Sequence, residues 1–397
     1  MRKDPKIFLA VDNCFASKRW TIPSEWMDVI QGVGLNCVEA SADTECDPLY
    51  MGGRYISDWI RDVQKEQERT GIVIKNLYSG HGTYATAGLA HTDPRVRRRF
   101  LQQWMETQAD TAKALGGGFG FFAHGFDDSI LQDAGAYAAK LEELYDTLAE
   151  LSAYCGSIDL CSVSLEQMYS PHQPPWTVDG TLKLVQEVWK RSGNAMYITN
   201  DVGHMNGQQF FQKPTKEYIL SCIEARKTGK PRKRVWLGSA KAMKLYYDAA
   251  AGKLSEESAA QRIMDDVEAN LHLFAKPEDG DVYYWLEKVG PWASIVHLQQ
   301  SDGKSSPHWC FDDDHNAIGI IDGEKVIRSV AAGFAEDPAE DMPEPTDEVV
   351  FTLEPFIGTA GNNYDALEEL ETSVRYWRKY IPADGMRLSE ALALLNR

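Results

Sequence analysis

Residues 196–206 read MYITNDVGHMN, and this stretch decides the fold class of the chain. It joins a short apolar run, 196–199, to Asp201 and His204. A continuous apolar run of this length is typical of a parallel strand that is covered on both faces. In barrel enzymes the working side chains lie at the carboxyl ends of such strands. The stretch therefore predicts a parallel strand with candidate functional residues at its end.

Seven further apolar runs lie on either side of this stretch, and amphipathic segments separate them. The runs are 7–11 (IFLAV), 37–40, 72–77 (IVIKNL), 119–123, 160–165 (LCSVSL), 294–298 (SIVHL) and 349–353 (VVFTL). The helix patterns cover 93–115, 133–154, 178–191, 216–226, 256–274 and 366–380. Eight strand–helix units predict an α/β fold, a closed (β/α)8 TIM barrel. An open doubly wound sheet is the alternative, but no glycine-rich phosphate fingerprint follows the first run.

One spacing along the chain is irregular. Nearly a hundred residues separate the starts of the runs at 196 and 294, whereas one β/α unit needs roughly thirty. The extra length contains a short strand candidate, 235–237, and helix patterns at 240–251 and 256–274. We expect one barrel domain over residues 1–397 with an insertion at about 207–280 after the sixth strand. This insertion would cap the barrel mouth or make a subunit contact.

Composition excludes several classes of partner. The formal net charge is −18, which argues against nucleic acid, because a phosphate backbone needs a basic surface. The one basic cluster, 227–234 (KTGKPRKR), is interpreted as a solvated turn rather than a binding patch. The seven cysteines are scattered without a CxxC pair, as in a reduced cytosolic protein. No apolar run approaches the ~18 residues of a membrane helix, and residues 1–12 lack the apolar core of a signal peptide. We expect a cytoplasmic location and no membrane partner.

Chemistry-bearing side chains follow the predicted strands. They are His81, His124, Glu166, Asp201, His204, His297, Gln299 and Glu354. Four successive strands end in a carboxylate, a carboxylate, a His/Gln pair and a carboxylate, and neighbouring strand ends of a barrel converge on one point. This set suits a divalent cation, with Mn²⁺ expected and Mg²⁺, Co²⁺ or Zn²⁺ as alternatives. Cysteine is absent from these positions.

Residues 297–308 contain the polar side chains that we expect to contact substrate. Alternation along a strand puts His297 and Gln299 on one face, and we expect Gln299 to be the ligand and His297 to lie deeper and orient it. His81 and His124 are further candidates for substrate contact. Lys304 and His308, with two serines between them, would hold a phosphate or a terminal hydroxyl. An ordinary polar loop explains that last group equally well.

At these residues the sequence resembles the sugar phosphate isomerase/epimerase family, the xylose isomerase-like TIM barrels that include ketose 3-epimerases and hydroxypyruvate isomerases. The resemblance follows the strand order through the whole chain. Its sharpest motifs are Glu166, D-x-x-H-M-N from Asp201, H-x-Q from His297 and L-E-P-F around Glu354.

That resemblance implies roles for these residues. Glu166 and Glu354 would bind the metal and form the acid/base pair, Asp201 would be a further ligand, and His204 would hold a substrate hydroxyl. The seventh-strand ligand is histidine in the epimerases and glutamine in hydroxypyruvate isomerases, and Gln299 matches the second. Members of the family are often dimers or tetramers, so a homo-oligomer is expected.

The expected function is a divalent-metal-dependent isomerase or epimerase of a sugar or sugar phosphate, working by proton transfer through an enediolate. Two departures leave the substrate open: residues 301–308 contain Lys304 but no arginine, and the insertion after the sixth strand is larger than usual. The main alternative is a metal-dependent lyase, a dehydratase or decarboxylase acting on an oxo-sugar or sugar acid. A DNA-repair endonuclease of related fold would need a basic surface, and a non-catalytic sugar-binding protein would not need three converging carboxylates.

Overall fold

Eight parallel strands form a closed barrel in the computed structural model, which describes residues 3–80, 84, 86–231 and 234–396. The order β2-β3-β4-β5-β6-β7-β8-β1 closes because β1 also pairs with β2. The strands are β1 (Lys6–Asp12), β2 (Cys37–Ser41), β3 (Val73–Ser79), β4 (Gly118–Phe121), β5 (Val163–Glu166), β6 (Tyr197–Asp201), β7 (Ala293–Leu298) and β8 (Glu348–Leu353). The predicted TIM barrel is confirmed, and each apolar run overlaps one strand.

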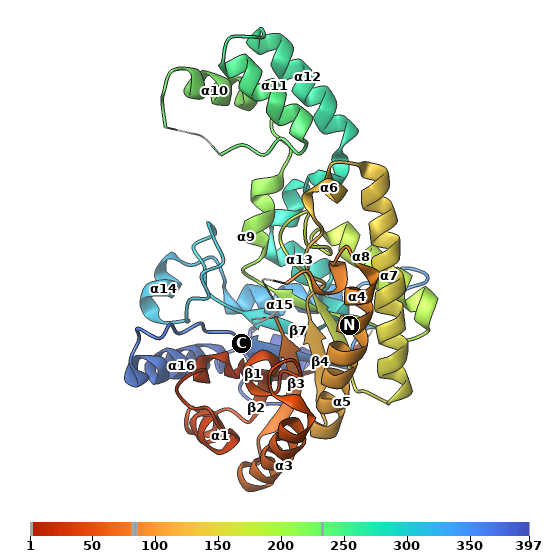
Figure 1. Cartoon of the computed structure of the whole chain (residues 1–397). Helices are drawn as coiled ribbons and strands as arrows, with labels where there is room; N and C mark the ends of the chain where they lie inside the picture. The colour runs from red at the N-terminus through yellow and green to blue at the C-terminus, as the bar shows by residue number, and fades with distance from the viewer. Residues whose placement is uncertain (1–2, 81–83, 85, 232–233, 397) are drawn as a thin grey trace.

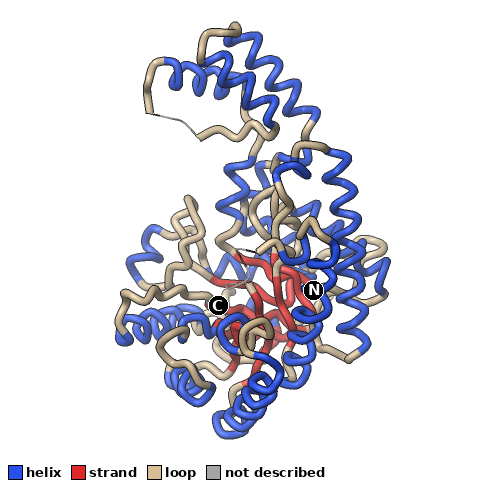
Figure 2. Tube along the Cα trace, viewed as in Figure 1, coloured by secondary structure: helices blue, strands red, loops and turns tan. Residues whose placement is uncertain are grey.

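Helices surround the barrel (Figure 1), and the strands lie inside them (Figure 2). In the first half of the chain they are α1 (Pro23–Gly32), α2 (Ala42–Glu45), α3 (Gly52–Thr70), α4 (Pro94–Phe100), α5 (Glu106–Leu115), α6 (Asp128–Leu131), α7 (Ala134–Ser157) and α8 (Val178–Ser192). The second half contains α9 (Met205–Gln208), α10 (Lys216–Lys227), α11 (Ala240–Ala250), α12 (Glu256–Ala269), α13 (Val282–Lys288), α14 (Asp313–Ile318), α15 (Gly323–Gly333), α16 (Asn363–Trp377) and α17 (Leu388–Leu394).

Large side chains fill the space between the strands and the helices. Phe351 of β8 stacks on Trp377 of α16 with ring centroids 6.4 Å apart, and both are fully buried. Burial of a phenylalanine of this kind contributes about 1.5–3 kcal/mol of stabilisation. Packing of this kind fixes the strand ends, and with them the side chains at the mouth of the barrel.

Local sequence signals set the ends of the helix predicted at 93–115. The side chain of Asp93 accepts a hydrogen bond from Arg95 N, and Pro94 occupies the first helical position. The helix ends at Gly116, whose φ of 77° is a left-handed conformation that glycine adopts without strain. Residues Leu101–Met105 within it form a π-helical segment that periodicity did not predict.

Two expectations about secondary structure were wrong. Residues 235–237 form no strand, because the closed barrel offers no free edge at that point; instead Trp236 Nε1 donates to Leu273 O at 2.8 Å. The helix expected over 256–274 ends at Ala269. A short ninth strand, β9 (Met386–Arg387), was not expected and pairs antiparallel with β1.

The long connection between β6 and β7 contains α9 to α13. Helices α10, α11 and α12 pack on one another and project from the barrel, at the top of Figure 1. At the base of this projection, Ala240 N donates to Gln132 Oε1 at 2.7 Å and His272 Nε2 lies 3.0 Å from Leu131 O. Within the described part of the chain, no helix has the length and apolar character required to cross a membrane.

Candidate active site

The carboxyl ends of β5 to β8 bring acidic and imidazole side chains together. Glu166 ends β5, Asp201 ends β6, His297 lies in β7, and Glu354 directly follows β8. The register aligns Asp201 with His297, and His297 with Thr352. All four candidate side chains are buried. This is the end of a TIM barrel at which catalytic groups lie.

His297 is at the centre of this group. Its Nε2 lies 2.7 Å from Glu39 Oε1, and because a carboxylate only accepts, Nε2 carries the proton. Its Nδ1 lies 3.4 Å from Glu166 Oε1 and 3.4 Å from Glu354 Oε2. Burial opposes charge on this imidazole, but Glu354 and Glu39 outweigh burial and raise its pKa well above the usual range. Positive charge is therefore stabilised at this point, as a proton on the ring or as a cation beside it.

Gln299 holds Asp201 in position. Its Nε2 lies 2.9 and 3.0 Å from the two Asp201 oxygens, and its Oε1 accepts from Ser306 Oγ and His308 N. Both ends of the amide are thus engaged within the protein. A Cβ at Gly203 would lie 2.3 Å from Gln299 Cδ, so the glycine of the D-V-G-H stretch leaves space for this amide.

The donor set fits a divalent cation. Among the buried polar atoms described, His297 Nδ1 and Glu354 Oε2 have no hydrogen-bond partner. Leaving a buried polar atom unpaired costs about 1–3 kcal/mol, so two such atoms at one point indicate a ligand position. Asp201, His297 and Glu354 have ligand atoms within 4.8 Å of one another, and so do Glu166, Asp201 and His204. Oxygens with one or two nitrogens suit Mn²⁺ or Mg²⁺.

A cavity of about 760 Å³ opens onto these residues. Glu166, His204, His308 and Glu354 line it, and so does Tyr78. Burial and the neighbouring Glu166 raise the pKa of Tyr78 well above its usual range, so its hydroxyl stays protonated and donates to Glu166 Oε2.

His204 and His308 both line the cavity, and different neighbours hold their rings. His204 Nδ1 lies 2.8 Å from the Gln167 carbonyl, which makes Nδ1 the donor, and its Nε2 lies 3.7 Å from Asp201 Oδ2. His308 Nδ1 lies 3.3 Å from Glu354 Oε2, and the His308 ring stacks on Phe356 with centroids 3.8 Å apart. Both imidazoles are therefore oriented before any ligand binds.

The remaining sequence candidates, Lys304, His124 and His81, differ in their position relative to the cavity. Lys304 lines the cavity with its side chain 83% exposed. His124 is buried between Phe100 and Phe122, lies outside the cavity lining and has no hydrogen-bond partner among the described residues. Its φ is +63°, and burial lowers its pKa to about 3, so it is neutral. This position favours packing over substrate contact. His81 lies outside the described residues.

Three residues at the site were not among the sequence candidates. Glu39, in β2, supports His297, Tyr78, in β3, contacts Glu166, and Arg234, in the insertion, lines the cavity wall. Tyr78 lies next to the end of β3, and that position is the signal that could have identified it, whereas Glu39 lies in the middle of β2, where only a carboxylate inside a fully buried strand could have pointed to it. Arg234 belongs to the basic cluster that we interpreted as a solvated turn, and no sequence pattern connects it to the barrel mouth.

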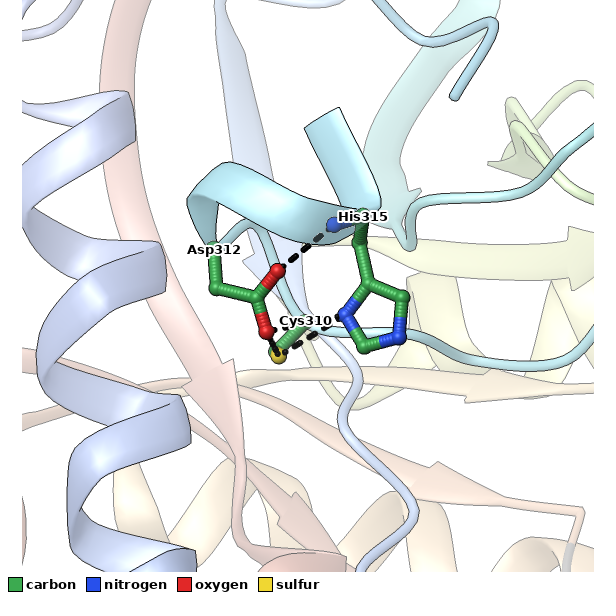
Figure 3. Close-up of side chains that lie close together, drawn as sticks. All are labelled: Cys310, Asp312 and His315. Carbon is green, nitrogen blue, oxygen red and sulfur yellow. Dashed lines mark hydrogen bonds and ion pairs between the residues drawn. The ribbon is translucent and has the colours of Figure 1, made fainter. Parts of the chain in front are cut away.

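A separate cluster lies beside α14 (Figure 3). Asp312 Oδ2 is 3.2 Å from Cys310 Sγ and 3.0 Å from His315 Nδ1, and Asp312 Oδ1 accepts from His315 N at 2.7 Å. Asp312 thereby caps the first turn of α14. These three residues do not line the cavity, and hydrogen bonds to the cap account for their arrangement.

Comparisons with known proteins agree with this fold. D-erythrulose 1-phosphate 3-epimerase of Brucella abortus (strain 2308) is 27% identical over 119 residues, 30% of this chain and 35% of that protein. The chain thus spans about a third of the length of this curated relative. A Rhodospirillum rubrum ATCC 11170 structure, provisionally classed as a xylose isomerase, superposes with a TM-score of 0.67 at 16% identity, covering 94% of this chain and 98% of that one.

The structure of an L-ribulose 3-epimerase superposes with a TM-score of 0.53 at 11% identity, covering 98% of this chain and 96% of that one. At these identities both structures show the fold alone. The family model of the xylose isomerase-like TIM barrel matches residues 27–233, more than half of the chain. The protein therefore belongs to the xylose isomerase-like TIM barrel family.

Proposed function

We propose that this protein is a divalent-metal-dependent epimerase or isomerase of a ketose or ketose phosphate. The observation that carries the proposal is the pair of buried glutamates at the cavity. Glu166 and Glu354 each lie 3.4 Å from His297 Nδ1, and both line the same cavity. Two carboxylates that face one ligand position are the physical requirement for moving a proton on two faces of a substrate.

In this mechanism one glutamate removes the proton from the carbon next to the substrate carbonyl, and an enediolate results. The other glutamate returns a proton. Delivery to the opposite face of the same carbon inverts it, which is epimerisation. Delivery to the former carbonyl carbon, with transfer of the neighbouring hydroxyl proton to the former carbonyl oxygen, is isomerisation. Tyr78 donates to Glu166 and His308 lies beside Glu354, so each carboxylate has its own neighbour that holds its orientation.

Glu166, Asp201, His297 and Glu354 are the residues that we propose to hold the cation. When bound there, a divalent cation polarises a carbonyl and acidifies the adjacent C–H. We favour His297 over Gln299 as the seventh-strand ligand, since Nδ1 is unpaired while the Gln299 oxygen already accepts two hydrogen bonds. Gln299 would then orient Asp201, and Glu39 would orient His297, as a carboxylate behind a ligating histidine does.

The relatives support epimerisation in particular. The curated relative is named as a 3-epimerase of a ketose phosphate, and one of the superposed structures is named as a ketose 3-epimerase. We further propose Mn²⁺ as the cation, a homodimer or homotetramer as the assembly, and a cytoplasmic location, which suits seven free cysteines.

Deuterium wash-in tests the proposal. The Mn²⁺-loaded protein is incubated in heavy water with four- to six-carbon ketoses and their monophosphates, and NMR follows each carbon. Exchange at the carbon next to the carbonyl, with the appearance of the epimer, is the expected result. The proposal is wrong if metal is bound and no compound exchanges, or if a sugar acid instead loses water or carbon dioxide.

A further inference from the structure

Two positively charged side chains line the cavity that contains Glu166 and Glu354. Arg234 comes from the segment that precedes α11, and Lys304 comes from the loop after β7. The carboxylates that line this wall, Glu166 and Glu354, lie at the ends of barrel strands. The cavity therefore has an acidic region at the strand ends and a basic region formed by two loops.

Arg234 is held in place without a carboxylate. Its guanidinium lies over the ring of Phe210, 3.6 Å from the centroid, and its carbonyl accepts a hydrogen bond from Tyr218 at 2.8 Å. No ion pair joins Arg234 to a carboxylate among the residues that the structure describes. An arginine stacked on an aromatic ring keeps the N–H groups in its plane available for a ligand.

A hydrogen bond brings Lys304 to the same part of the wall. Gln209, next to Phe210, donates from Nε2 to Gly303 O at 2.7 Å. The segment under Arg234 and the segment that bears Lys304 are thus joined. Lys304 Nζ lies 2.7 Å from Asp302 Oδ2, and its side chain is exposed. Exposed ion pairs of this kind contribute little stability, so a dianion in the cavity competes for this ammonium group.

We propose that Arg234 and Lys304 bind a phosphate monoester, and that the substrate is a ketose monophosphate. This inference rests on the proposed function, because it assigns the substrate class of the same cavity. Arginine binds phosphate oxygens in a bidentate manner, and lysine adds a point charge. The negative phosphate is attracted to the basic region, while the carbonyl and hydroxyl oxygens of the sugar suit the proposed cation position at Glu166 and Glu354. The ester therefore orients the sugar with its carbonyl towards the glutamates.

The rest of the cavity suits the carbon chain of such a molecule. Aromatic rings of Tyr84, Phe122, Tyr169 and Phe211 also line it. A volume of about 760 Å³ lies within the range of small-molecule sites and exceeds what a short unphosphorylated sugar occupies. A sugar acid offers one negative charge instead of two, and it is the alternative anion that the experiment separates.

The test is calorimetry on the Mn²⁺-loaded full chain with ketose monophosphates, their unphosphorylated parents and the corresponding aldonates. The variant is Arg234→Gln. The matched control is Arg226→Gln, because Arg226 also lies over a ring, Tyr247 at 4.5 Å, in the same insertion but outside the cavity. We expect a monophosphate to bind at least 10-fold more tightly than its parent. Arg234→Gln should remove most of that difference, and Arg226→Gln should preserve it.

Equal affinity for phosphorylated and parent sugars would overturn the inference, as would an Arg234→Gln variant with unchanged phosphate preference. Tighter binding of aldonates than of monophosphates would also overturn it. Failure of the proposed function is a different result: phosphate-dependent binding through Arg234 would persist, but no carbon would exchange deuterium. Exchange in unphosphorylated ketoses alone would retain the epimerase and reject the phosphate subsite.

Discussion

The two glutamates at the cavity are expected to be separately essential. Glu166→Gln and Glu354→Gln keep the size of each side chain but remove its basicity, so each should lower turnover at least about 100-fold. The control is Glu348→Gln, which changes a carboxylate at the opposite end of β8, where Glu348 pairs with Lys75 at 2.8 Å. Deuterium exchange and product formation are measured together. Near-normal rates in either cavity variant would remove that glutamate from the mechanism.

Glu39 is expected to affect metal binding indirectly, because it contacts His297. Its carboxylate accepts from Nε2 and so directs Nδ1 towards Glu166 and Glu354. Glu39→Gln should weaken Mn²⁺ binding about 10- to 100-fold, the usual effect of changing the group behind a ligating histidine. Excess Mn²⁺ should then restore most of the turnover, which a purely structural defect would not allow. An unchanged dissociation constant for Mn²⁺ would show that Glu39 does not position the ligand.

At the scale of elements, the packing of α2 against α3 gives a pH-dependent stability. Glu45 of α2 is buried and accepts from Trp59 Nε1 of α3 at 2.9 Å, and burial raises its pKa from 4.5 to about 7. The folded state therefore binds more protons than the unfolded state between pH 4.5 and 7. The free energy of unfolding falls as pH rises through that window.

Glu45→Gln removes this titration and keeps an acceptor for Trp59. Its stability relative to the wild type should increase from pH 5 to about pH 7 and then level off, as measured by urea denaturation at fixed pH. Glu257→Gln, at an exposed position paired with Lys216, is the control and should show no such trend. A difference between Glu45→Gln and wild type that is constant across this range would place the Glu45 pKa near its ordinary value.

The assignment of His297 and Gln299 also belongs to the scale of elements. Alternation along the chain predicts that both side chains share one face, but it cannot show which group faces the carboxylates. Two neighbouring segments support our proposal that His297 is the ligand: Asp201 of β6 and the loop with Ser306 bind the two ends of the Gln299 amide. Asp201 is 98 positions from Gln299 in the sequence, and Ser306 is joined to it by an irregular loop. The periodicity of a strand therefore gives no information about either contact.

At the scale of the whole molecule, metal binding should raise the melting temperature. A ligand that binds only the folded state stabilises it by about 2.7 kcal/mol at a concentration 100 times its dissociation constant. Chelation should therefore lower the Tm of the Mn²⁺-loaded protein by a few degrees. Asp201→Asn should abolish this difference, because Asp201 lies in both ligand groups at the barrel mouth.

Cys310→Ser is the matched control for this measurement, since Cys310, Asp312 and His315 form the other group of metal-ligand atoms among the described residues. The chelation effect should be unchanged in that variant. Loss of the effect in Cys310→Ser, and its persistence in Asp201→Asn, would move the cation from the barrel to the cluster of Figure 3.

The sequence by itself determined the barrel and the acidic end of its site. Strands covered on both faces must be continuous apolar runs, and their carboxyl ends must converge, so Glu166, Asp201 and Glu354 could be grouped without coordinates. Tertiary structure alone decided which atoms face one another. Glu39 and His297 are 258 positions apart and touch only because the barrel closes. Arg234 reaches the cavity only because the insertion folds back over Phe210. Such contacts depend on the paths of loops and on tertiary packing, and neither produces a periodic pattern of residues in the sequence.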